Sequence, residues 1–206
     1  MNKQEKLKKI AIGVEDFKEI IDKDGYFVDK TLMIKKLIES QAKVTLFTRP
    51  RRFGKTLNQF MIRRFFEDEI TEKGEKVDNG YLFNGLKIAE CGEEIMQHQQ
   101  QYPVIFMTLK SAKQPTYEMA HGALTDEIYN EFVRHRYVLQ SDALLPIEKE
   151  RYENLINRRA GKEELAKAFA FLSMCLLNTI KRKQLSSSTS TMCRWKTRIS
   201  EAFMTR

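Results

Sequence analysis

The chain has 206 residues, of which 42% are apolar and 31% charged, a balance that suits a globular protein with one sizeable core. No apolar stretch is long enough for a membrane span, and residues 1–9 are too polar for a signal peptide. The three cysteines, Cys91, Cys175 and Cys193, are scattered without the spacing of metal ligands. We therefore expect a cytoplasmic protein with no membrane partner.

The formal net charge of +8 is concentrated at one end of the chain. Residues 181–206 hold seven basic residues and one acidic residue, which leaves 29 basic and 27 acidic residues for the rest. A nearly balanced body predicts no clear nucleic-acid surface on the folded part. The sequence does not indicate a protein partner.

In chain order, residues 14–22 predict a short helix, followed by a turn at Asp24-Gly25. Asp29 or Thr31 can cap a second helix, in which apolar residues keep helical spacing from Leu32 to Ile38. Lys43 to Thr48 is apolar and β-branched, and predicts a buried strand.

A third helix is predicted from Leu57 to about Ile70, with its Met and Phe residues in the core. Residues 71–80 form a polar connection, and Tyr102–Leu109 predict a second buried strand. The remaining predicted helices span residues 117–135, 147–159 and 163–177. His135, between two arginines, is expected on a solvated helix face, and the three histidines lack metal spacing.

The segment from Phe47 to Leu57 carries the clearest functional signal. A predicted strand, a tight loop with Gly54-Lys55-Thr56 and a helix form the layout of a phosphate-binding P-loop. In such a loop, backbone N–H groups and the positive end of a helix meet a phosphate, and the lysine adds a full charge. Arg49 stands where the usual spacing has its first glycine, and Pro50 can stiffen the loop.

The loop predicts ATP as ligand, with Mg²⁺ bound by the hydroxyl of Thr56. Arg51 and Arg52 either contact phosphate or are solvated, and the sequence leaves both alternatives open. The predicted nucleotide-binding residues are Arg49, Arg51, Arg52, Phe53, Gly54, Lys55, Thr56 and Leu57.

The sequence of this loop, Arg-Pro-Arg-Arg-Phe-Gly-Lys-Thr-Leu, resembles that of the bacterial AAA-ATPase-like family. The resemblance covers about residues 10–177 and continues in three further segments, Gly25–Thr31, Phe83–Ile88 and Tyr102–Lys110. It implies an α/β fold, a P-loop NTPase-type parallel sheet flanked by helices, often followed by a nuclease-like domain. Within the family an arginine at position 49 is the norm. The resemblance also implies that Asp29 and Lys30 lie near the nucleotide entrance, although Asp29 can equally be a helix cap.

A P-loop ATPase also needs acidic residues that hold Mg²⁺ and polarise the attacking water, and nothing after Leu177 supplies them. We therefore assign no catalytic residue and expect the sheet to be incomplete, because the chain ends before the strand with the acidic motif. The predicted division is residues 1–177, an N-terminal part of the ATPase domain, and residues 178–206, an out-of-frame and disordered tail.

Whether residues 178–206 are out of frame can be tested by shifting the reading frame by one nucleotide. Each new codon then takes the third base of one codon and the first two bases of the next. Met192-Cys193 then must give Val, and Trp195-Lys196 must give Glu. The shifted frame permits Leu-Ile-Asp-Glu-Tyr-Asp-Val-Pro-Leu-Glu from residue 186 onward, which resembles the acidic second motif of the family. We expect a frameshifted, truncated product of an ATPase gene that binds ATP. The alternatives are an Arg-rich nucleic-acid-binding module and an inert fragment.

Overall fold

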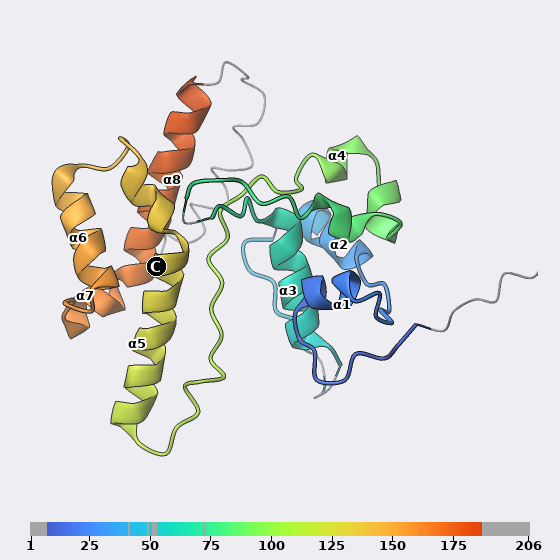
Figure 1. Cartoon of the computed structure of the whole chain (residues 1–206), viewed down its shortest axis with the longest axis horizontal. Helices are drawn as coiled ribbons and strands as arrows, with labels where there is room; N and C mark the ends of the chain where they lie inside the picture. Colours follow the sequence, from blue (N-terminus) through green and yellow to red (C-terminus); the bar gives the residue numbers. More distant parts are fainter. Residues whose placement is uncertain (1–7, 41, 49, 51–52, 72, 187–206) are drawn as a thin grey trace, which may run out of the picture. The chain divides into compact units, whose positions relative to one another are not determined.

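The computed structural model describes residues 8–40, 42–48, 50, 53–71 and 73–186. The chain divides into two units, one built from residues up to 69 together with 78–104, the other from 70–77 together with the chain from 105 onward. The regular secondary structure described in both units is helical (Figure 1). Within the described residues, no helix is long and apolar enough to cross a membrane.

The first unit contains short helices whose starts are fixed by local hydrogen bonds. The carboxylate of Asp16 accepts a hydrogen bond of 2.9 Å from the backbone N–H of Lys18 and so caps α1. Helix α1 then packs against α3. The bounds are α1 Phe17–Asp22, α2 Leu32–Ser40, α3 Lys55–Phe66, the 3₁₀ helices η1 Gly80–Phe83 and η2 Lys87–Glu90, and α4 Glu93–Met96.

Three phenylalanines join these helices in the core of the first unit. The ring of Phe83 lies 5.2 Å from that of Phe17 on α1 and 5.2 Å from that of Phe65 on α3. All three side chains are buried, as is Met61. The expectation that the Met and Phe residues of this helix serve the core is confirmed for Met61 and Phe65.

The second unit is a helical cluster. Its bounds are α5 Tyr117–Arg134, η3 Arg136–Gln140, α6 Pro146–Ile156, α7 Lys162–Ala166 and α8 Ala168–Ser186. Helix α5 packs against α6 and α8, and α7 against α8. At the centre, the buried Tyr152 donates a hydrogen bond of 2.9 Å from its hydroxyl to the carbonyl of Phe132. The hydroxyl of this buried side chain is thereby satisfied.

Each predicted helix corresponds to a helix in the structure, although α3 spans Lys55–Phe66 rather than Leu57 to about Ile70, and α4 was not predicted. The helix predicted over residues 163–177 is two helices, α7 and α8, which are separated at Lys167, and α8 continues to Ser186. The solvated position expected for His135 is wrong. Its side chain is only 2% exposed and lies 3.4 Å from the carboxylate of Glu131.

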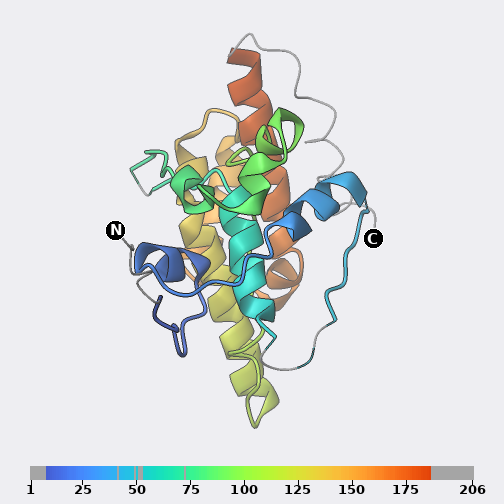
Figure 2. The same cartoon turned by 90° about the vertical axis from the view of Figure 1, so that its right-hand side faces the viewer.

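The predicted parallel sheet is wrong, because the described residues form no strand. Lys43–Thr48 runs as an extended segment between α2 and α3 (Figure 2). Val44 and Leu46 on it are 85% and 82% exposed. An extended segment becomes a strand only when a neighbour accepts and donates its backbone hydrogen bonds. The apolar residues of this segment meet no such neighbour among the described residues.

The second predicted strand is not formed for a different reason. Its backbone groups form hydrogen bonds with residues in or next to helices. The N–H of Tyr102 donates to the carbonyl of Phe66 at the end of α3, and the carbonyl of Tyr102 accepts from Asp68. Farther along, in the second unit, the N–H of Phe106 donates to the carboxylate of Glu131 on α5 at 2.7 Å. Only isolated bridges remain in the described chain, such as the parallel bridge between Glu67 and Tyr102.

Candidate functional site

Gly54 forms the turn that begins the longest helix of the first unit. It precedes α3 with φ 70° and ψ 27°, the left-handed conformation that glycine adopts without cost. Its carbonyl accepts the N–H of Asn58 at 2.9 Å, which closes the first helical turn. The first amides of a helix have no partner within the helix, so those of Lys55, Thr56 and Leu57 are suited to bind an anion.

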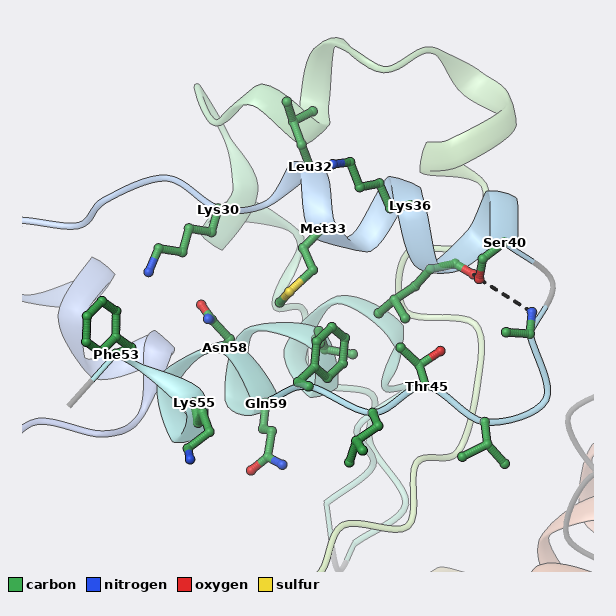
Figure 3. Close-up of a pocket in the computed structure, with 16 residues that line it drawn as sticks. Lys30, Leu32, Met33, Lys36, Ser40, Thr45, Phe53, Lys55, Asn58 and Gln59 are labelled. Atoms are coloured by element: carbon green, nitrogen blue, oxygen red, sulfur yellow. Dashed lines mark hydrogen bonds between the residues drawn. The ribbon is translucent and has the colours of Figure 1, made fainter. Parts of the chain in front are cut away.

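A pocket of about 680 Å³ lies beside this turn, bounded by α2, the extended segment 42–47 and α3 (Figure 3). Its apolar wall comes from both helices and the segment, with Met33 and Ile62 among its members. Its polar lining comprises Lys30, Lys36, Ser40, Thr45, Lys55, Asn58 and Gln59. The pocket therefore offers an apolar surface next to a set of hydrogen-bond donors.

Among the residues that the structure describes, every ionisable side chain that lines this pocket is a lysine. Lys30 precedes α2 and extends toward the start of α3, where Phe53 and Lys55 lie (Figure 3). Lys36 lies one turn into α2. Since none of the described residues that line the pocket is acidic, its lysines favour an anionic ligand.

The structure brings part of the predicted site to this pocket. Phe53, which is 56% exposed, and Lys55 line it. Gly54, Thr56 and Leu57 lie in the same turn but are not among the lining residues. Arg49, Arg51 and Arg52 lie outside the described residues.

Sequence reasoning missed five polar residues of the pocket, namely Lys36, Ser40, Thr45, Asn58 and Gln59. Two of them could have been found from the motif. Residues three and four positions apart lie on one face of a helix, so Asn58 and Gln59 follow Lys55 by one turn. Lys36 comes from a different helix, and only the packing of α2 on the site identifies it.

The alternatives for Asp29 are resolved by its hydrogen bonds. One carboxylate oxygen accepts the N–H and the hydroxyl of Thr31, at 2.8 and 2.6 Å, and the other accepts the N–H of Lys87 at 2.8 Å. Burial raises its pKa, but the hydrogen bonds from Lys87 and Thr31 outweigh that effect and lower the pKa below its usual value. Asp29 therefore ties the start of α2 to η2, while its neighbour Lys30 faces the pocket.

The donors around the turn suit a phosphate better than a metal ion. The lysines and helix amides match phosphate oxygens. Mg²⁺ prefers carboxylate and other oxygen ligands. Across the described part of the chain, no group of three or more His, Cys, Asp or Glu side chains could hold a metal. A nucleotide fits these residues, and a magnesium ion held by the protein alone does not.

Comparison with known families agrees with this chemistry. The model of a family described as Predicted AAA-ATPase matches residues 11–183. The chain belongs to this AAA-ATPase-like family. No curated protein and no solved structure matches the chain. Membership suggests that this AAA-ATPase-like protein uses a nucleotide, in accordance with the resemblance seen in its sequence.

Proposed function

We propose that the pocket between α2 and α3 binds ATP, with the phosphates at the turn of Gly54, Lys55 and Thr56. The observation that carries this proposal is the position of Lys55. It is the first residue of a twelve-residue helix, directly after a left-handed glycine, and it lines a pocket to which the described part of the chain contributes no carboxylate. These are the features that a phosphate-binding turn requires, even though the strand that usually precedes such a turn is not formed.

Each residue of the turn has a distinct task in this proposal. Lys55 neutralises the outer phosphates, and the amides of Lys55, Thr56 and Leu57 donate to phosphate oxygens. Phe53 offers an exposed ring at the rim of the pocket. Arg49, Arg51 and Arg52 precede the turn in sequence and supply further positive charge. The apolar wall that includes Met33 and Ile62 accommodates the less polar part of the nucleotide.

The proposal concerns binding and contains no hydrolytic step. Mg²⁺ bound to a nucleotide neutralises and bridges its outer phosphates. In this chain the hydroxyl of Thr56 would reach such an ion, which would arrive with the nucleotide. Turnover would require carboxylates beside Thr56, and the described residues that line the pocket include none.

A shifted reading frame of the gene can encode such carboxylates. We propose that one base was inserted or lost near codon 178, since the shifted frame permits Asp-Glu-Tyr-Asp over the serine- and threonine-rich stretch from residue 186 to residue 192. Sequencing the source DNA tests this directly. If the shifted codons do not spell that acidic run, the proposal is wrong.

The binding proposal is tested by titrating labelled ATP with Mg²⁺ into the wild-type chain and into Lys55→Ala. We expect at least about tenfold weaker binding for this variant, because a charge-assisted phosphate contact is lost. Lys35→Ala is the matched control, since Lys35 lies outside the pocket and pairs with Glu39 at 3.7 Å. Equal affinities for Lys55→Ala and the control would overturn the proposal.

A further inference from the structure

The extended segment between α2 and α3 has an apolar face that the first unit leaves uncovered. Val44 and Leu46 alternate along it and are 85% and 82% exposed, whereas Phe47 on the alternate face is 37% exposed. Figure 2 shows no second extended segment of the described part of this unit beside it. Because successive side chains of an extended chain point to opposite faces, Val44 and Leu46 share one solvated face.

The backbone of this segment is as open as its apolar face. Among the described residues, the N–H and carbonyl groups of residues 43–48 form no hydrogen bond with one another or with another part of the chain. Elsewhere in the first unit, the amides of Tyr26 and Tyr102 in extended segments already donate to carbonyl groups. An apolar run with unpaired backbone groups is a template for a strand of another chain.

The order of residues in the segment suits antiparallel pairing with a second copy of itself. In a two-fold pairing centred on Thr45, Val44 of each copy lies directly opposite Leu46 of the other. The two exposed apolar residues thus contact each other across the pair, and Thr45 lies opposite Thr45. Apolar pairs and threonine pairs at directly opposite positions both stabilise a sheet.

Charge favours this register over the one centred on the next residue. Within residues 42–48 the only charged side chain in the sequence is that of Lys43, which lies opposite Phe47 when the pairing is centred on Thr45. A pairing centred on Leu46 would put Lys43 opposite the arginine at position 49 of the sequence. Like charges directly opposite one another destabilise a strand pair. The same segment of a second chain therefore satisfies the apolar face, the open backbone and the charge together.

We propose that two copies of this chain associate by antiparallel pairing of residues 43–47 about Thr45. The pairing supplies partners for the backbone groups and brings Val44 and Leu46 of the two copies into contact. It goes beyond the proposed nucleotide binding, which needs a single copy. Since a ribbon of two short strands is marginal in water and buries little area, we expect the dimer to form at high protein concentration and to dissociate on dilution.

Cysteine cross-linking tests the register. Val44→Cys, Thr45→Cys and Leu46→Cys are each made in a chain whose native cysteines other than the buried Cys175 are replaced by serine. A disulfide needs Cα atoms about 4.4–6.8 Å apart, which holds for directly opposite residues at about 4.5–5.5 Å and not for diagonal ones at about 7–8 Å. On oxidation, Thr45→Cys should link two copies by itself, whereas Val44→Cys and Leu46→Cys should link only when mixed with each other.

Sedimentation over a concentration series tests the association itself. Val44→Lys/Leu46→Lys places like charges opposite each other and should weaken self-association at least about tenfold. Ile10→Lys/Ile12→Lys is the matched control, because it makes the same change of charge at exposed apolar residues of the same unit, and it should stay within about twofold of the wild type. Circular dichroism establishes that both variants retain the helical content of the wild type.

Three results would overturn the inference. The first is a wild-type chain that is monomeric at every concentration. The second is equal weakening of self-association by the variant and by the control, which indicates a general effect of charge. The third is cross-linking of all three single cysteine variants to the same extent, which indicates contact without a register. Each of these results leaves the proposed nucleotide binding standing, since that is measured by the Lys55→Ala titration.

Discussion

Replacement of Gly54 by alanine tests whether the turn at the pocket depends on its left-handed backbone. At φ 70° an alanine costs roughly 1–2 kcal/mol relative to its ordinary conformations. Alanine also restricts the unfolded chain, which returns about 0.4–1 kcal/mol. Apart from its chain neighbours, no heavy atom of the described residues lies within 4 Å of the added Cβ, so the structure shows no steric cost to add. The expected net loss is about 0.5–1 kcal/mol in the stability of the first unit.

Gly122 supplies the matched control, because it lies inside α5 and, among the described residues outside its own helix backbone, its added Cβ also meets nothing within 4 Å. Alanine is favoured over glycine in a helix by up to about 1 kcal/mol, so Gly122→Ala stabilises the second unit. Native-state hydrogen exchange measures the opening free energy of each unit separately. We expect amides of α3 in Gly54→Ala to exchange about two to five times faster, and amides of α5 in Gly122→Ala to exchange more slowly. Shifts of the same sign in both variants would refute the reasoning.

Three further predictions concern stability. Asp29→Ala removes the acceptor that joins α2 to η2 and should lower the free energy of unfolding by about 1–3 kcal/mol in a urea titration, whereas an unchanged midpoint would contradict that role. Burial lowers the pKa of His98, whose ring nitrogen lies 2.5 Å from the hydroxyl of Tyr102. The unfolded chain therefore binds more protons, so stability should fall as the pH drops through about 6.5, and a pH-independent melting temperature for the first unit would contradict this. Tyr152→Phe leaves the carbonyl of Phe132 without its hydroxyl donor and should lower the stability of the second unit by about 1 kcal/mol. Amides of α5 should then exchange faster, and unchanged exchange would contradict this role.

The helices were predictable because their signals are local. Helix α2 follows a segment with an Asp and a Thr that fix its start, and its buried residues Ile34 and Ile38 are one turn apart. Helix α6 begins at Pro146 and was found from its apolar spacing alone. The split between α7 and α8 at Lys167 was not predictable, since the apolar stripe continues across it.

The sheet was wrongly predicted because strand formation depends on distant partners. Lys43–Thr48 and Tyr102–Leu109 both have the composition of buried strands. In the structure, Tyr102 bonds instead to the end of α3, and Val44 and Leu46 remain exposed. A sequence pattern describes which face of a segment is apolar, whereas the neighbour that would cover that face lies elsewhere in the chain.

The candidate site was predicted only where it is continuous in sequence. Phe53 and Lys55 belong to the recognised turn and line the pocket. Lys36 comes from a helix that precedes the turn, and its charge is unremarkable in a sequence with 36 basic residues. Its position beside the pocket follows from the packing of α2, which no spacing rule expresses.

The central claim is that the phosphates of ATP lie against the lysines of this pocket. An ATP derivative with an acyl group on its terminal phosphate tests the claim directly, because a nearby lysine amine attacks the acyl carbon, takes the acyl group and releases ATP. Mass spectrometry of the labelled chain then identifies the acylated residues. The account predicts preferential labelling of Lys55 and Lys30, suppressed by excess ATP, with exposed Lys43 as the internal reference. Labelling that is spread evenly over the lysines and unaffected by ATP would contradict it.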